Sequence, residues 1–221
     1  MIISHKHKFI FIHTNKCAGS SIEVSLASVC DEDDLIGPVT NEGLPDDYKH
    51  PNTFQEHQEE TGGIYNAMRA EEIKNYIGDD IWNEYFKFSV RRNPWERAVS
   101  FWHWRNRGKT HKIEQYLNED VKHPLSFLWT FTHMPVPSIT KQLQINKKFD
   151  INYLIAYENL STGYEQVCNK LNIKPIDLPR AKSGYRDNKI PYHRFYTPTT
   201  KKLIDKIYKD DIDNFGYKFG E

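Results

Sequence analysis

Three short runs of mostly apolar residues lie far apart along the chain. They are Phe9 to Ile12, Tyr85 to Arg91, and Ile151 to Tyr157. The first run is continuously apolar, which is typical of a strand covered on both faces, as in a parallel sheet. The sequence therefore predicts three buried strands.

The first predicted strand is followed, after a loop, by residues with helical spacing. Ile22, Leu26 and Val29 fall at the i, i+4 and i+7 positions of one helix face. Ser20 and Glu23 have the spacing of a capping box, so we expect the box to stabilise the start of this helix.

The second predicted strand leads into a helix with stronger start signals. Asn93 can cap this helix, Pro94 suits its first position, and Glu96 completes a capping box. Another helix is expected near residues 70–77, ending at Gly78.

The last part of the chain continues the alternation of strands and helices. Thr197 and Pro198 open a final helix, and an apolar stripe predicts a helix after the third strand, formed by Tyr164, Val167, Cys168 and Leu171. This alternation indicates an α/β fold with a P-loop-like parallel sheet flanked by helices. We predict a single domain over residues 1–221, with irregular segments near 31–66 and 102–148.

Composition and charge narrow the class of protein. The chain has 30 Lys and Arg against 30 Asp and Glu, so no global field favours nucleic acid or an anionic membrane. Three cysteines without a CxxC pair fit a reduced, cytoplasmic setting. No segment approaches about 18 consecutive apolar residues, so no membrane span is expected. No metal-ligand cluster is visible either.

The loop after the first strand has the composition of a local anion site. In HTNKCAGSSIE, Lys16 supplies a charge, Ala18 and Gly19 admit close approach, and Ser20 and Ser21 add hydroxyl donors. A strand-loop-helix unit also aims backbone amides and the positive end of the helix dipole at its loop. These features favour a phosphate-like ligand. The alternative is an ordinary tight turn with a solvated lysine, and the loop is no Walker A motif because Lys16 precedes the glycine.

A second anion-binding element follows the second strand. Arg92 stands just before the helix cap, where its guanidinium can reach a phosphate at the helix amino terminus. Arg97, Ser100 and Trp104 share one side of the helix, so that side can touch a ligand. For Arg97 the alternative is a surface ion pair, and for Trp102 and Trp104 it is packing in the core or at its rim.

These two motifs resemble those of a known family. FIFIHTNKCAGSSIE resembles the 5′-phosphosulfate loop of the sulfotransferases that use 3′-phosphoadenosine 5′-phosphosulfate (PAPS), especially their carbohydrate, or family 2 type, branch. FSVRRNPWERAVSFW resembles the 3′-phosphate motif of the same family. AYENLSTGYEQVCNKLNI and the segment ending in FGYKF resemble its later parts, so the resemblance runs from about Phe9 to Phe219.

The resemblance implies a role for each matching residue. The 5′-phosphosulfate would be bound by Lys16, Cys17, Ala18, Gly19, Ser20 and Ser21, and the 3′-phosphate by Arg92 and Ser100. Lys16 would also be catalytic, by stabilising the oxygen that leaves with the product 3′-phosphoadenosine 5′-phosphate (PAP). The loop departs from the family pattern at three positions, since Asn15 replaces a proline, Cys17 a threonine and Ala18 a glycine.

The general base of the family has no counterpart at the matching position. GIYNAMRAEEI resembles a segment in which the family has a histidine where this chain has Ala67, and alanine cannot accept a proton. Either another base acts, such as His57 or one of Glu59 and Glu60, or the chain is an engineered variant that holds substrate without turnover. His13 is near the loop, but its place at the end of a buried strand favours a structural role.

The sequence thus predicts an enzyme that transfers a sulfuryl group from PAPS to a hydroxyl or amine of a carbohydrate or small metabolite. Residues 41–66 and the stretch from Trp102 to Met134 are expected to form the acceptor wall. The alternatives are a P-loop-like nucleotide kinase, disfavoured by the missing Walker A motif, and a non-catalytic nucleotide-binding module. The pattern leaves the oligomeric state and the acceptor open.

Overall fold

The computed structural model describes residues 1–37, 67–106, 123–174, 177–179 and 190–221. The chain forms two compact units, each built from two separate stretches. Unit 1 consists of Met1–Arg91 and Lys141–Lys182, and unit 2 of Arg92–Thr140 and Ser183–Glu221. The assignment of all 221 residues to one domain stays a prediction.

The main sheet of unit 1 is mixed, with a parallel part that matches the sequence prediction. Among the described residues it has five strands in the order β3 (Leu35–Ile36), β1 (Ile2–Ser4), β2 (Phe9–Ile12), β4 (Phe86–Arg91) and β7 (Tyr153–Ala156). Strands β2, β4 and β7 run parallel, whereas β1 is antiparallel to both β2 and β3. The three predicted strands are therefore confirmed, and β1 and β3 extend the sheet beyond them.

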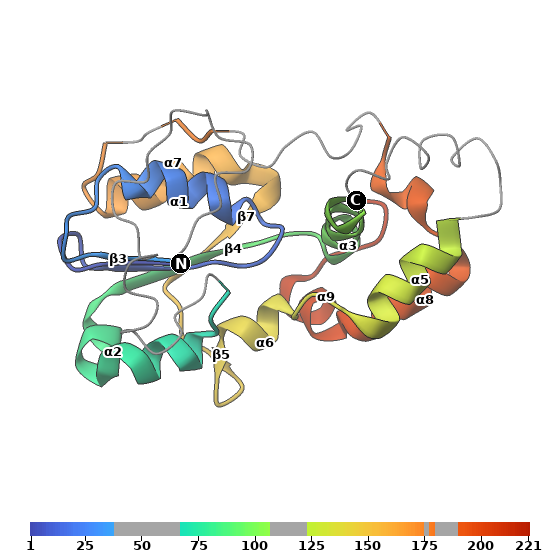
Figure 1. Ribbon diagram of the computed structural model, residues 1–221, viewed down its shortest axis with the longest axis horizontal. Helices are drawn as coiled ribbons and strands as arrows, with labels where there is room; N and C mark the ends of the chain where they lie inside the picture. Colours follow the sequence, from blue (N-terminus) through green and yellow to red (C-terminus); the bar gives the residue numbers. More distant parts are fainter. Residues whose placement is uncertain (38–66, 107–122, 175–176, 180–189) are drawn as a thin grey trace. The chain divides into compact units, whose positions relative to one another are not determined.

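Helices cover both faces of this sheet, which confirms the α/β fold (Figure 1). Helices α1 (Gly19–Ala27) and α7 (Leu160–Lys170) lie on one face, and α2 (Ala70–Glu84) lies on the other. The Tyr164 hydroxyl is 2.7 Å from the Ser25 hydroxyl, which joins α7 to α1. Residues Tyr164, Val167 and Cys168 are buried, as the apolar stripe predicted.

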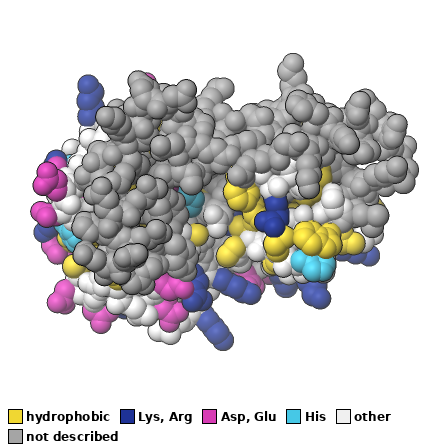
Figure 2. Space-filling model, viewed as in Figure 1, with side chains coloured by type: hydrophobic (Ala, Val, Ile, Leu, Met, Phe, Trp, Pro, Cys, Tyr) yellow, Lys and Arg dark blue, Asp and Glu magenta, His cyan; other side chains and the backbone are white. Residues whose placement is uncertain are grey.

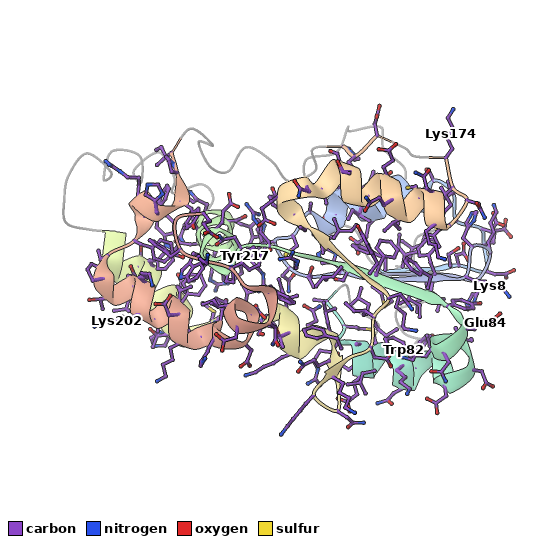
Figure 3. All side chains as sticks on the ribbon, turned by 180° about the vertical axis from the view of Figure 1, so that it is seen from behind. Lys8, Trp82, Glu84, Lys174, Lys202 and Tyr217 are labelled. Atoms are coloured by element: carbon purple, nitrogen blue, oxygen red, sulfur yellow. The ribbon has the colours of Figure 1, made fainter. Side chains whose placement is uncertain are left out.

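Helix α2 does not end at Gly78 as expected. Gly78 has a φ of 84°, a value that glycine adopts readily, and the helix resumes beyond it as far as Glu84. Near its end, Lys8 pairs with Glu84 at 2.5 Å, and the Trp82 indole donates to Asp150 at 2.7 Å (Figure 3). The prediction thus located the break in the helix but mistook a kink for an end.

The remaining elements of unit 1 are short. They are the 3₁₀ turn η2 (Tyr157–Asn159) and an antiparallel pair formed by β5 (Gln144–Ile145) and β6 (Lys148–Phe149). In the chain, α6 (Ile139–Leu143) directly precedes β5. The segment expected to be irregular near 102–148 therefore contains regular elements in its described part.

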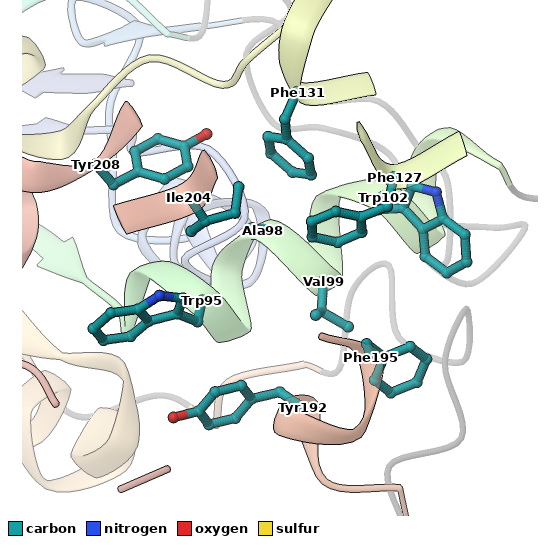
Figure 4. Packing of buried hydrophobic residues seen from close by; sticks show 10 residues of the cluster. All are labelled: Trp95, Ala98, Val99, Trp102, Phe127, Phe131, Tyr192, Phe195, Ile204 and Tyr208. Atoms are coloured by element: carbon teal, nitrogen blue, oxygen red, sulfur yellow. The ribbon is translucent and has the colours of Figure 1, made fainter. Parts of the chain in front are cut away.

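Unit 2 is helical and has an aromatic core (Figure 4). Its elements are α3 (Pro94–Arg105), α5 (His123–His133), η3 (Tyr192–Phe195), α8 (Pro198–Ile207) and α9 (Lys209–Phe215). The core contains ten buried residues, namely Trp95, Ala98, Val99, Trp102, Phe127, Phe131, Tyr192, Phe195, Ile204 and Tyr208. Burial of these side chains supplies the main apolar stabilisation of the unit.

The aromatic stretch from Trp102 to Met134 is therefore not simply an acceptor wall. Trp102, Phe127 and Phe131 are 1% exposed and pack in the core, which corrects that expectation for these three residues. Trp129 on α5 is 53% exposed, and Figure 2 shows hydrophobic and histidine side chains at the surface over this helix. Within the described residues, no helix is both long and apolar enough to cross a membrane.

Arg97 is a buried residue, so the expectation of a surface ion pair is wrong. Its guanidinium donates to the Pro137 carbonyl at 2.7 Å and lies 3.5 Å from the Asp211 carboxylate. Asp211 also accepts from the Ser138 hydroxyl at 2.6 Å and the Thr140 amide at 2.8 Å. The carboxylate thus joins α9, α3 and the first residues of α6.

We expect Asp211→Ala to destabilise the protein by about 3–5 kcal/mol, because it leaves a buried guanidinium without its carboxylate. Asp213→Ala on the same helix is the matched control. Asp213 makes an exposed ion pair with Lys209, so we expect its loss to leave the stability nearly unchanged. Chemical denaturation measures both, and equal losses would contradict the central role of Asp211.

Candidate active site

The loop between β2 and α1 contains two residues in the left-handed region. Lys16 has a φ of 64° and Ala18 a φ of 61°. Ala18 is the N-cap of α1, and its carbonyl accepts from the amides of Ser21 at 3.0 Å and Ile22 at 3.2 Å. No side chain caps the helix, so the predicted box of Ser20 and Glu23 is wrong.

Three backbone amides at this turn are available to a ligand. Within the described part of the chain, the amides of Ala18, Gly19 and Ser20 donate no hydrogen bond. They lie at the amino end of α1, where the helix dipole places partial positive charge. An anion is the natural partner for such a group of donors.

The side chains of the loop divide between its surface and its interior. Lys16 and Ser20 are half-buried, whereas Ser21 is 6% exposed. Cys17 is fully buried, and its thiol approaches the Asn15 carbonyl at 3.5 Å. The thiol therefore belongs to the turn, and the contribution of Cys17 to a ligand must come from its backbone.

Gly19 is needed because the His13 imidazole occupies the space beside it. A Cβ at Gly19 would lie only 2.5–2.7 Å from three atoms of that ring. His13 in turn is held by Glu23, whose carboxylate is 2.8 Å from Nδ1. The α-amino group of Met1 contacts the same Glu23 oxygen.

Glu23 is therefore an internal ion partner and not a helix cap. Burial by itself would raise the pKa of its carboxyl, but the interactions with His13 and with the Met1 amino group outweigh burial and lower this pKa to about 2. The carboxylate is ionised at neutral pH. The sequence pattern missed this role because it depends on contacts with residues before α1.

Ala67 lies close to the end of β2, because the side-chain amide of Gln142 binds backbone carbonyls of both segments. The Gln142 side-chain nitrogen donates to the His13 carbonyl at 2.7 Å and to the Ala67 carbonyl at 3.2 Å. Gln142 is 1% exposed, and nothing in the sequence had singled it out. His57, Glu59 and Glu60 lie outside the described residues.

The residues after β4 begin helix α3 as predicted. The Asn93 side chain accepts from the amides of Trp95 at 3.1 Å and Glu96 at 3.2 Å, which confirms the cap. Arg92 is 7% exposed, and its guanidinium lies 3.5 Å from the Glu96 carboxylate. Ser100 is half-buried further along the same helix.

The predicted site residues fall in both units. Lys16 to Ser21 and Ala67 belong to unit 1, whereas Arg92 and Ser100 belong to unit 2. In unit 1, two hydroxyls tie the strands that support the loop. Thr14 donates to the Val90 carbonyl at 2.5 Å, and Ser89 donates to the Ile12 carbonyl at 2.7 Å. No group of His, Cys, Asp or Glu in the described ranges is arranged to hold a metal ion.

A mostly parallel sheet with a tight turn between strand and helix defines a P-loop-like α/β protein. The model of the sulfotransferase family, of the family 2 type, matches residues 1–218, so the chain belongs to this family. An uncharacterized protein of Archaeoglobus fulgidus is 26% identical over 106 residues, which cover 48% of this chain and 83% of that protein. No solved structure matches the chain.

We expect Ala18→Gly to stabilise the protein by about 1 kcal/mol, because glycine adopts the left-handed conformation of this turn without strain. Ala27→Gly, at the last residue of α1, is the control. There the same substitution costs about 1 kcal/mol in helix propensity alone. Thermal unfolding measures whether the two substitutions change stability in opposite directions. A loss of stability at both positions would show that the turn at Ala18 is not strained.

Proposed function

We propose that the protein is a PAPS-dependent sulfotransferase that modifies a hydroxyl or amine of a carbohydrate or small metabolite. The observation that carries this proposal is the set of three amides beside Lys16 at the start of α1, in a chain of the sulfotransferase family. Together they offer directed hydrogen bonds and a full positive charge to a phosphosulfate.

The 5′-phosphosulfate is assigned to the turn from Lys16 to Ser21. The amides of Ala18, Gly19 and Ser20 supply donors that cost no reorganisation, because the helix already orients them. Cys17 can contribute its amide but not its buried thiol. Lys16 and Ser20 are half-buried, and their side chains can add a charge and a hydroxyl.

The 3′-phosphate is assigned to Arg92 and Ser100. Arg92 is held just before the capped end of α3, where a phosphate also benefits from the helix dipole. A buried guanidinium binds phosphate more strongly than an exposed one, since less water competes with it. Glu96 keeps this guanidinium paired when no phosphate is present.

The reaction is an in-line displacement at sulfur. The acceptor oxygen or nitrogen forms a bond to sulfur while the bond from sulfur to the phosphate oxygen breaks. Negative charge develops on that oxygen, and PAP leaves. As in phosphoryl transfer, positioning and electrostatic stabilisation supply most of the catalysis, and Lys16 is the cation for the leaving oxygen.

The proposal also includes a surface for the acceptor and a cytoplasmic location. Trp129 is an exposed aromatic face that suits a sugar ring or a flat metabolite. A cytoplasmic location is supported by the three cysteines, all among the described residues, which form no disulfide.

Transfer of labelled sulfate from PAPS to a library of sugars and small metabolites tests the proposal directly. We expect one acceptor class to become labelled, and PAP to raise the melting temperature more than ADP or ATP. A larger shift with ATP would favour a nucleotide kinase. A shift with PAP but no labelled product would favour a non-catalytic binding module.

Lys16→Ala is expected to lower the rate of transfer by about 10²–10³-fold while changing the affinity for donor far less. Lys8→Ala is a closely matched control, because Lys8 also has a positive φ, of 51°, but pairs with Glu84 at the other end of β2. Steady-state rates and calorimetric donor binding separate the two effects. An unchanged rate for Lys16→Ala would exclude its action on the leaving oxygen.

Arg92→Ala is expected to weaken PAP binding by about 1.5–3 kcal/mol, the range of a hydrogen bond to a charged group. Adenosine 5′-phosphosulfate, which lacks the 3′-phosphate, is the control ligand and should lose little affinity. Arg105→Ala at the exposed end of α3 is the control variant. The same loss for both ligands would show that Arg92 acts on the fold and not on the 3′-phosphate.

A further inference from the structure

His13 has the surroundings of an oriented base and not only those of a core histidine. Its Nδ1 is 2.8 Å from the ionised Glu23 carboxylate. A neutral imidazole that donates from Nδ1 carries its lone pair on Nε2. Among the described residues, the imidazole has a hydrogen-bond partner at Nδ1 but none at Nε2, and the side chain keeps 11% of its surface exposed.

The imidazole also lies at the turn that binds the anion. The space for a Cβ at Gly19 is filled by three atoms of this ring, and Gly19 supplies one of the three available amides. The sequence therefore keeps a glycine where the histidine meets the first turn of α1. A ligand bound to the Gly19 amide would therefore lie close to the His13 imidazole.

Ala67, the position where the family has a histidine, is next to His13 in the backbone. Gln142 joins the carbonyls of His13 and Ala67 through one nitrogen, at 2.7 Å and 3.2 Å. The backbone of residue 67 is thus held close to that of residue 13. A side chain at residue 67 therefore starts from backbone that is next to that of His13.

We propose that His13 is the general base of this enzyme and takes the place of the histidine absent at Ala67. This inference rests on the proposed function. His13 Nε2 accepts the proton of the acceptor hydroxyl as its oxygen bonds to sulfur, and the electron pair of the broken bond leaves with PAP. Glu23 stabilises the imidazolium that forms, and solvent then removes the proton.

The decisive experiment compares His13→Gln with the double variant His13→Gln, Ala67→His. The first should lose about 10²–10⁴-fold in turnover, the range for a positioned base, with PAP affinity kept within about threefold. The second should recover at least about tenfold, because it returns an imidazole to the neighbouring position. His7→Gln is the control, since His7 contacts the Val29 carbonyl and is expected to leave turnover unchanged.

Several results would overturn the inference. They are wild-type turnover in His13→Gln, equal losses of turnover and PAP affinity in it, or no recovery in the double variant. Ala67→His alone provides a test that leaves His13 intact. We expect its turnover to stay within about threefold of wild type, and a rise of about 10²-fold would show that the chain had lacked a base. A wild-type protein that binds PAP but transfers nothing to any acceptor overturns the proposed function itself, and this inference with it.

Discussion

The left-handed turn at Ala18 is the constraint on which the candidate site depends. With a φ of 61°, Ala18 starts α1 through its carbonyl and leaves the amides of residues 18 to 20 without an internal acceptor. The turn is sterically tight, because the His13 ring fills the space where Gly19 would carry a side chain. His13 is in turn fixed by Glu23 inside the protein. The contact between Glu23 and His13 therefore supports the backbone of the candidate anion site at the first residues of α1.

The sheet of unit 1 positions this turn. Parallel pairing aligns the ends of β2 and β4, and the hydroxyls of Thr14 and Ser89 join these ends by further hydrogen bonds. Unit 2 has a buried carboxylate, Asp211, beside its aromatic core. Asp211 pairs with Arg97 and accepts hydrogen bonds from the first residues of α6. Each unit thus combines an apolar interior with buried carboxylates that bind neighbouring groups, Glu23 and Asp34 in unit 1 and Asp211 in unit 2.

Local patterns were sufficient to predict much of the fold. The strands β2, β4 and β7, the Asn93 cap and the start of α8 at Thr197 all follow from neighbouring residues, and all are confirmed. The strands β1 and β3 were missed because three and two residues are too few to show a period. Glu23 and Arg97 were misinterpreted for a different reason. Their partners are distant in sequence, so a capping spacing or a helix face gives no sign of a buried ion pair.

The proposed function requires that the amides at the start of α1 bind the donor's phosphate. Amide chemical shifts of isotope-labelled protein, recorded during a titration with PAP, measure this residue by residue. We expect the amides of Ala18, Gly19 and Ser20 to shift strongly and together, while the Val29 amide, bonded to Leu26 beyond the far end of α1, stays unchanged. PAP binding without a change at these three amides would show that the start of α1 is not the phosphate site.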